Sequence, residues 1–321
     1  MSDASLSESS QVLQNEDLFE SLIRACQRQK AIPVAVCWPC SSVSLAGAVE
    51  AARSGLILPV LVGNEREIRE IADREGLNIE TYPIMEANTE EDAAIQSVEL
   101  CRSGRSASLM KGSLHTDVLM HAVLKEQGLR TSRRISHIFI MEAPLYHRQV
   151  LFITDSALNI SPSLEDKVDI VQNAIDLAHA LGVSEPRVAI LSAVETVCSK
   201  MMSTVDAAAL CKMADRGQIT GAILDGPLAF DTAVSAEAAL RKDLKSPVAG
   251  EADILVAPDL EAGNMLAKEL EYLGGARSAG IVMGAKVPII LTSRADSVNS
   301  RVASCAVASV LVHRPAKGQN A

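Results

Sequence analysis

Two hydrophobic patterns alternate along the 321 residues of the chain. Short runs of Val, Ile and Leu are typical of buried strands, and the segments between them place apolar residues three and four positions apart, as amphipathic helices do. Alternation of this kind predicts an α/β fold with mostly parallel sheets. The expected strands are 32–37, 56–62, 107–110, 137–141, 150–154, 187–191, 221–224, 254–257 and 288–291, and the expected helices are 17–29, 43–52, 65–75, 90–102, 116–125, 164–181, 205–215, 260–273 and 297–312.

The segment 164–181 gives the clearest helix signal. Ser163 precedes it and Asp166 follows three residues later, which is the spacing of a capping box. Gly182 supplies a stop after the last apolar position. We therefore expect a long, well-capped helix here.

One connection breaks the alternation. Only residues 142–149 join the strands 137–141 and 150–154, which is too short for a crossover helix. The two strands are therefore antiparallel neighbours or belong to different sheets, and we expect a domain boundary at this point. The final helix fits either domain, and we group it with the first. The expected organisation is a disordered acidic tail at 1–15, a first α/β domain at 16–145 plus 294–321, a second at 146–293, and a cleft between the two domains.

Composition narrows the function classes. Apolar residues make up 48% of the chain, which excludes wholesale disorder, and aromatic residues make up only 2%, which predicts an aliphatic core. A net charge of −10 with so few aromatic rings argues against nucleic-acid binding. No apolar run approaches the roughly 18 residues of a membrane span, and the polar N-terminus does not resemble a signal peptide. We expect a cytoplasmic protein without membrane or nucleic-acid partners.

The charge is unevenly distributed. Residues 102–137 carry seven Lys and Arg against two acidic residues, so this stretch has a charge of +5 inside an acidic chain. Such a field suggests an anionic small-molecule ligand. A solvated basic surface paired with acidic residues elsewhere would give the same count. Charge alone leaves both interpretations open.

Cysteine and histidine give no metal or redox signature. The seven Cys residues are odd in number and scattered, which argues against a disulfide framework. Cys37 and Cys40 form a C-x-x-C pair without a second ligand pair, so we interpret them as buried structural residues. The six His residues show no metal-ligand spacing, and we expect no metal site.

Four predicted strands end in polar or glycine-rich turns, where open α/β sheets place their ligands. In the first, Lys111 and Gly112 lead into a helix that begins near Thr116, a combination suited to an anion or to an ordinary turn. In the second, Asp155 and Asn159 could orient a substrate or cap the loop.

The other two strand ends carry acidic and basic chemistry. Asp225 and Asp231 surround a Gly-Pro turn, for which turn and capping roles are favoured over a metal site. Ser293 and Arg294 stand between the last strand and the last helix. An arginine grips two oxygens at once, and the hydroxyl and backbone amides add donors, so this turn suits a phosphate as well as a helix cap.

Together, these segments resemble the phosphate acyltransferase family of phosphate acetyltransferases and phosphate butyryltransferases. The resemblance covers about residues 105–305 and is specific as a set. It is carried by LMKGSLHTDVLMHAVLKEQGLR, LFITDSALNISPSLEDK, IVQNAIDLAHALG, ILDGPLAFDTAVS, SPVAGEADILVAPDLEAGNML and VPIILTSRADS.

The resemblance implies two α/β/α domains like those of isocitrate and isopropylmalate dehydrogenases, and a homodimer or higher homo-oligomer. It implies the reaction of acyl-CoA with phosphate to give acyl phosphate and CoA, with coenzyme A as co-substrate and no permanently bound cofactor. By the same resemblance, Ser293 and Arg294 act at the active site in the cleft. Residues placed in the cleft wall by motif are Lys111, Gly112, Thr116, Asp155, Asn159 and Asn264.

Two departures from the family pattern bear on the acyl group. Acetyl-specific members resemble S-R-G-x-S-x-x-D, but here Ser300 stands at the position of that last aspartate, the base for the CoA thiol. They also carry an arginine where Met120 aligns. The S-R-A-D-S form favours a butyryl-type enzyme, with Asp296 as a possible base. The alternatives are a phosphate acetyltransferase, an NAD-dependent decarboxylating dehydrogenase of the same fold, and a non-catalytic protein that binds CoA or acyl phosphate.

Overall fold

The computed structural model describes residues 17–314, and their contacts divide the chain into two units. The split unit comes from two stretches, up to Arg133 and from Ala279 onward, and the middle unit is the continuous stretch Arg134–Ser278. The expected boundaries after residues 145 and 293 lie further along the chain than these divisions. The expected tail at 1–15 lies outside the described residues.

The strands of the split unit follow the order β3-β2-β1-β4-β11-β10. Neighbouring strands run parallel from β3 to β11, and β10 is antiparallel to β11. A parallel arrangement gathers the carboxyl ends of the strands at one edge of the sheet. The strands are β1 (Ile32–Cys37), β2 (Ile57–Gly63), β3 (Ile84–Glu86), β4 (Ser108–Lys111), β10 (Arg277–Met283) and β11 (Ile289–Ile290).

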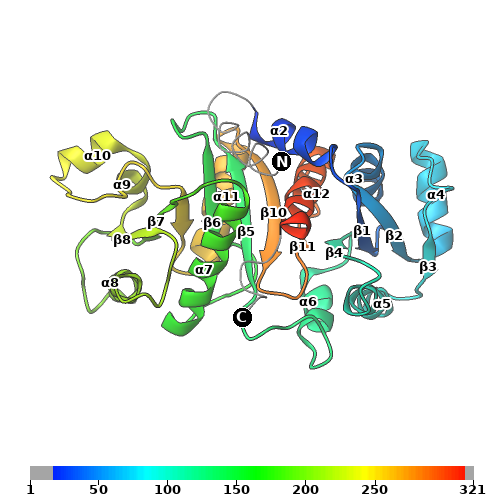
Figure 1. Cartoon of the computed structure of the whole chain (residues 1–321), viewed down its shortest axis with the longest axis horizontal. Coiled ribbons are helices and arrows are strands. Elements are labelled where there is room, and N and C mark those ends of the chain that lie inside the picture. The colour runs from blue at the N-terminus through cyan, green and yellow to red at the C-terminus, as the bar shows by residue number, and fades with distance from the viewer. Residues whose placement is uncertain (1–16, 315–321) are drawn as a thin grey trace, which may run out of the picture. The chain divides into compact units, whose positions relative to one another are not determined.

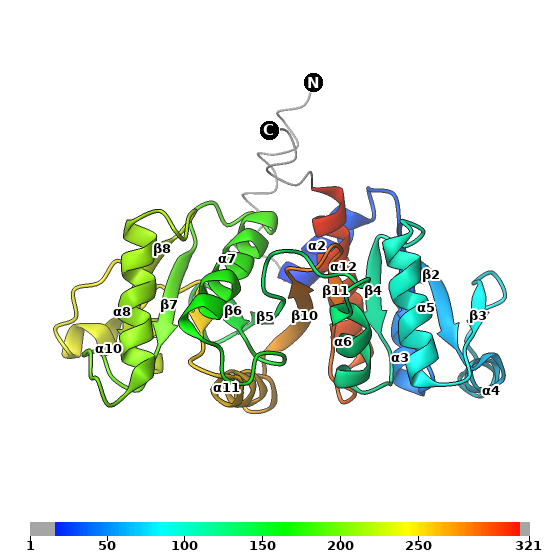
Figure 2. The same ribbon diagram turned by 90° about the horizontal axis from the view of Figure 1, so that it is seen from below.

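Helices cover both faces of this sheet (Figure 1). The helices α3 and α12 pack against each other on one face, and α2 contacts α12. The pair α5 and α6 covers the other face, as Figure 2 shows from below. The last helix therefore belongs to the split unit. The helices are α2 (Leu18–Cys26), α3 (Ser42–Arg53), α4 (Glu65–Glu75), α5 (Glu90–Arg102), α6 (Thr116–Leu124) and α12 (Val298–His313).

The strands of the middle unit follow the order β5-β6-β9-β7-β8. All neighbouring strands run parallel except β5 and β6, which form an antiparallel pair. The short connection 142–149 is thus a hairpin loop inside one unit. The elements are β5 (Ser136–Glu142), β6 (Val150–Thr154), α7 (Leu164–Ala180), β7 (Arg187–Leu191), α8 (Met202–Asp215), β8 (Ile223–Leu228), α9 (Phe230–Val234), α10 (Ala236–Arg241), β9 (Ile254–Val256) and α11 (Leu260–Tyr272).

The expected α/β alternation is confirmed, and so is the capping box of α7, in which Ser163 and Asp166 each accept the other's amide. The strands β3 and β10 and the helices α9 and α10 were not predicted. The β10 sequence, Arg277–Met283, contains Ser, Ala and Gly in place of a β-branched run, yet most of it is buried. The segment forms a strand because of its tertiary packing, which cannot be read from the local sequence pattern. The expected cleft and the likeness to isocitrate dehydrogenase stay predictions.

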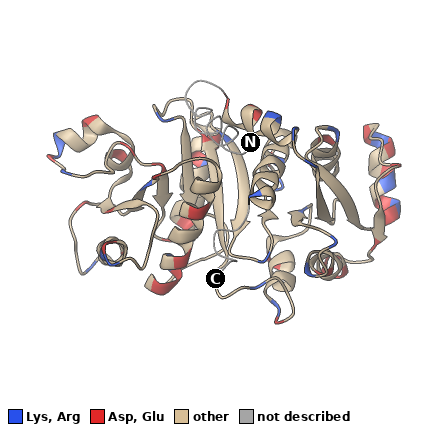
Figure 3. Ribbon diagram, viewed as in Figure 1, with Lys and Arg blue, Asp and Glu red and all other residues tan. Residues whose placement is uncertain are grey.

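The cores are aliphatic, as the composition predicts, and buried aromatic side chains are few among the described residues. Charges of both signs are interspersed on α4, where Arg66 pairs with Glu70 and Arg69 with Glu65 (Figure 3). Within residues 17–314, no helix combines the length and apolar character that crossing a bilayer requires.

Candidate active site

The turn after β4 and the loop after β11 begin side by side. These two strands pair in parallel, with Leu109 opposite Ile289 and Met110 opposite Ile290. Lys111 therefore leaves the sheet beside the segment that leads to Ser293. Two of the four strand ends singled out in the sequence thus meet within the split unit.

Lys111 is buried with little to satisfy its charge. The residue is 2% exposed, and its Nζ lies 3.5 Å from the carbonyl oxygen of Gly112. Burial lowers the pKa of Lys111 to about 8, and the positive charges of Arg301 and Arg294 add to the effect. The basic segment 102–137 is therefore not one solvated face, because Lys111 points inward while Arg102 is exposed and paired with Glu99. A buried, weakly partnered ammonium group is suited to meet an anion.

Gly112 fits because the backbone of the β1–α3 connection lies against it. Its amide donates to the carbonyl of Cys37, and a Cβ at this position would lie 2.2 Å from the carbonyl oxygen of Trp38. Ser113 donates to the same Trp38 oxygen through both its amide and its hydroxyl. The Lys111 turn is therefore held by hydrogen bonds to the backbone of Cys37 and Trp38, and it has no space for a side chain at Gly112.

The loop after β11 is folded by its own acidic residue. The carboxylate of Asp296, which is buried, accepts the amide of Ser293 at 2.7 Å. The hydroxyl of Ser293 accepts the amide of Ala295, and Arg294 is exposed. Asp296, predicted as a possible base, thus shapes the loop that presents Ser293 and Arg294. Whether it also accepts a proton stays a prediction.

Arg301, which the sequence analysis did not single out, joins the two segments. Its Nη2 donates to the carbonyl of Ser293 at 2.9 Å, and its Nη1 lies 3.5 Å from the carbonyl of Lys111. Burial lowers the pKa of Arg301, and Asp296 opposes that shift. Arg301 belongs to no motif that the sequence analysis used. A single arginine among the small and apolar residues of α12 was nevertheless a signal of a buried charge.

The helix α6, which follows the Lys111 turn in the chain, begins without a side-chain cap. His115 precedes Thr116 at the N-cap position and makes no capping bond, so backbone amides of the first turn keep donor capacity. Met120 in α6 is buried. Ser300 in α12 shares a hydrogen bond with the N-cap Ser297.

The other predicted site residues lie in the middle unit, where the loop after β6 uses their polar atoms. Asp155 accepts the amides of Ala157 and Leu158 and the side-chain amide of Asn159. Asn159 also accepts Arg134 Nε at 2.7 Å. Asn264 in α11 donates to the carbonyl of Ser156. The geometry therefore supports the loop-capping interpretation of Asp155 and Asn159.

The remaining candidates show no ligand-binding geometry. Asp231 pairs with Lys242, and Asp225 accepts the amide of Gly226. Across residues 17–314, no three His, Cys, Asp or Glu side chains are grouped as metal ligands. Burial raises the pKa values of Cys37 and Cys40 to about 12, so both remain protonated thiols near neutral pH.

Comparison with known proteins shows the family of the chain. The family profile described as phosphate acetyl/butaryl transferase matches residues 87–309, which is more than half of the chain and includes both strand-end loops of the split unit.

The chain belongs to the phosphate acetyl/butyryl transferase family. It is 57% identical to a phosphate acetyltransferase of Rhizobium meliloti over 92% of this chain and 94% of that protein. It is 41% identical to a phosphate butyryltransferase of Clostridium beijerinckii over 92% and 98%. A branched-chain phosphotransacylase from Enterococcus faecalis V583 superposes with a TM-score of 0.76 at 31% identity, covering 88% of this chain and 100% of that one. The predicted resemblance is confirmed, and the chain is an acyltransferase.

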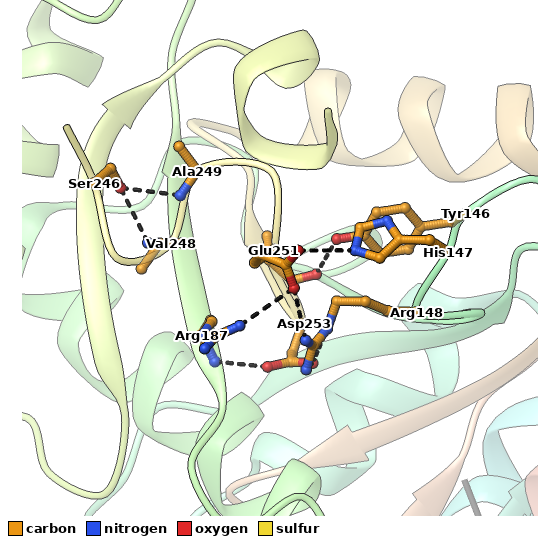
Figure 4. A network of polar contacts seen from close by, with 10 residues as sticks. Tyr146, His147, Arg148, Arg187, Ser246, Val248, Ala249, Glu251 and Asp253 are labelled. Carbon is orange, nitrogen blue, oxygen red and sulfur yellow. Dashed lines mark hydrogen bonds and ion pairs between the residues drawn. The ribbon is translucent and has the colours of Figure 1, made fainter. Parts of the chain in front are cut away.

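In this transferase, the SPVAGEADIL motif builds a polar network in the middle unit (Figure 4). Asp253 accepts Arg148 Nη2 at 2.6 Å and the amide of Arg187, and Glu251 pairs with both arginines. The hydroxyl of Ser246 accepts the amides of Val248 and Ala249. The segment before β9 is thus bonded to Arg148, which precedes β6, and to Arg187, the first residue of β7.

An apolar cavity of about 560 Å³ lies beside this network in the transferase. Leu145, Tyr146 and Phe230 line it, together with the C-terminal end of α11. Its lining includes none of the residues predicted to act on substrate. The cavity is therefore a feature separate from the strand-end loops of the split unit.

Proposed function

We propose that the chain transfers a short acyl group between coenzyme A and inorganic phosphate, with the phosphate held at the carboxyl ends of β4 and β11. The observation that carries this proposal is the parallel pairing of these strands, which starts the Lys111 turn beside the Ser293–Arg294 loop. Cationic groups, a hydroxyl and the uncapped start of α6 then converge on one edge of the sheet.

The chemistry needs no covalent enzyme intermediate. A phosphate oxygen attacks the thioester carbonyl of acyl-CoA, a C–O bond forms, the C–S bond breaks, and the CoA thiolate leaves and takes a proton. In this proposal Arg294 and Lys111 hold the phosphate, and the Ser293 hydroxyl donates to the carbonyl oxygen as it becomes negative. Alignment of two bound substrates supplies much of the rate. Gly112 and Thr116 offer backbone amides, whereas Asp155, Asn159 and Asn264 hold the loop after β6.

The proposal is tested by measuring CoA release from acyl-CoA with and without phosphate. We expect release by the purified protein only when phosphate is present. Arg294→Ala should lower kcat/KM for phosphate by about 10²-fold, because a bidentate cation is lost. Arg102→Ala, which removes an exposed arginine paired with Glu99, is the matched control and should leave the rate unchanged. Release without phosphate, or binding of CoA with no turnover, would contradict the proposal.

The acyl group is a finer proposal. Relatives named phosphate acetyltransferase, among them one from Rickettsia prowazekii that is 53% identical, support acetyl-CoA as the preferred substrate. Met120 and Ser300, at positions where acetyl-specific members carry Arg and Asp, favour butyryl-CoA as the second candidate. Comparing kcat/KM for acetyl-, propionyl-, butyryl- and hexanoyl-CoA at saturating phosphate decides between them, with a ratio above about tenfold taken as a preference.

We further propose that the protein is a homo-oligomer, as the family resemblance implies. Leu145, which lines the apolar cavity in the middle unit, is 91% exposed, and Leu273 is 83% exposed at the end of α11. Exposed apolar side chains around a cavity support a contact with another protein surface.

A further inference from the structure

Arg301 has the largest side chain among the described residues that are almost fully buried. It lies in the second turn of α12 and is 1% exposed. Burying a cation costs solvation free energy unless other groups replace the lost water. The partners that the fold provides therefore indicate what this side chain does.

The partners of Arg301 are backbone carbonyls of two active-site segments. Nη2 donates to Ser293 at 2.9 Å, and Nη1 approaches the oxygen of Lys111 at 3.5 Å. Its Nε is buried and has no hydrogen-bond partner within residues 17–314. The carboxylate of Asp296 raises the pKa of Arg301, against the larger effect of burial. The positive charge of Arg301 is therefore stabilised by the carbonyls of two loops and by the charge of Asp296.

The neighbouring helix makes room for this side chain. Gly47 lies in α3, and a Cβ there would lie 2.6 Å from Cδ of Arg301 and 3.0 Å from its Cβ. Glycine inside a helix is less favourable than alanine. The two helices α3 and α12 pack against each other, so Gly47 and Arg301 act as a matched pair. The buried arginine is therefore accommodated by a specific feature of a second element.

We propose that Arg301 is a positioning residue, which ties the Ser293–Arg294 loop to the Lys111 turn and thereby sets both to receive one phosphate. This inference rests on the proposed function. The guanidinium acts through the two carbonyls it holds and does not itself touch the substrate. Because the Lys111 and Ser293 segments contribute their charges and hydroxyl from different strands, their relative placement depends on this link.

An electrostatic consequence follows for Lys111. The titratable groups that act on it are Arg301 from α12, Arg294 and Asp296 from the loop after β11, and the Cys37 thiol from β1. The charge of Arg301 lowers the pKa of Lys111, so removing that charge should raise this pKa above its value of about 8. A side chain that only filled space would not have this effect.

The experiment compares full-length Arg301→Gln, Arg301→Lys and Arg102→Gln with wild type, using acyl-CoA and phosphate from pH 6.5 to 10. We expect Arg301→Gln to lower kcat/KM for phosphate by about 10²-fold, because a small displacement of reacting groups is enough. KM for acyl-CoA should change less than about twofold. The alkaline limb of kcat/KM should move to higher pH in Arg301→Gln and stay near pH 8 in Arg301→Lys, which keeps the charge and part of the rate. Arg102→Gln should match wild type.

Two outcomes would overturn the inference while leaving the proposed function intact. One is a folded Arg301→Gln with wild-type KM for phosphate and an unshifted pH profile. The other is a loss shared equally by phosphate and acyl-CoA kinetics without a pH shift, which would indicate a purely structural role. If Arg301→Gln does not fold, Gly47→Ala decides in its place. It keeps the charge but displaces the side chain, and should weaken phosphate use without shifting the alkaline limb. An inactive wild type would instead reject the proposed function.

Discussion

At the scale of single residues, the buried charge of Lys111 is held at a cost to stability. Lys111 is protonated at neutral pH although its folded-state pKa of about 8 lies below the ordinary lysine value of 10.5. The folded state therefore binds this proton more weakly than the unfolded state does. The resulting destabilisation is fully present below pH 8 and is relieved as pH rises from 8 to 10.5.

This lysine gives the residue-scale prediction. Lys111→Met should raise the free energy of unfolding at pH 7 by about 2 kcal/mol, because the shift of Lys111 corresponds to roughly 3 kcal/mol and the variant loses the Gly112 contact. It should also raise KM for phosphate. Urea denaturation at pH 7 measures the first effect and steady-state kinetics the second. A variant less stable than wild type at pH 7 would show that Lys111 is better solvated than its burial indicates.

At the scale of elements, the site depends on turns whose backbones contact each other. The Lys111 turn is hydrogen-bonded to the Trp38 carbonyl through the amide of Ser113, and in the loop after β11 the Asp296 carboxylate accepts the amide of Ser293. Each turn connects a strand to a helix, so displacing one changes where the helix begins. At Gly112 the Trp38 carbonyl leaves no space for a Cβ, so this turn is the more sensitive of the two to an added side chain.

Gly112→Ala therefore tests the element scale. The added Cβ would meet the Trp38 carbonyl at 2.2 Å, so the turn must shift. We expect a loss of about tenfold or more in kcat/KM for phosphate together with a lower Tm. Ser163→Ala is the control, because it removes the N-cap of α7 in the middle unit. It should cost about 1 kcal/mol of stability and leave kcat/KM unchanged. Equal activity losses in both variants would show that the effect of Gly112→Ala is only a general loss of stability.

At the scale of the whole molecule, the two units have different roles in our proposal. The split unit carries the phosphate-binding loops, and the middle unit carries the polar network and the exposed apolar cavity. The chain as a whole carries a net charge of −10, whereas residues 102–137, which include Lys111, carry +5.

The cavity supplies the whole-molecule prediction. If a second copy of the chain covers this apolar surface, wild type should show at least twice the 34.1 kDa mass of the chain in light scattering. Leu145→Glu should reduce the mass toward one chain, because an unpaired carboxylate would be buried in the contact. Leu240→Glu, a similarly exposed leucine outside the cavity lining, is the control. An unchanged oligomer in Leu145→Glu would exclude this surface as the contact.

The sequence by itself determined the elements and the family. Hydrophobic periodicity is a local property, so it predicted most strands and helices, including the capped α7. Motifs such as VPIILTSRADS, taken in their order along the chain, identify a family because they can be read from the sequence without knowing the fold. The same local view missed β10, whose Ala and Gly residues are made a strand by their neighbours.

The tertiary structure alone decided which distant residues meet. Because β4 pairs with β11, the segments that contain Lys111 and Ser293 leave the sheet side by side. Almost two hundred residues separate them in the chain, and no local sequence pattern spans that distance. It also distinguished Arg301, a buried link, from Arg102, an exposed surface pair, although both are arginines in helices. Burial and pairing determine what a charge can do, and both arise only when the chain has packed.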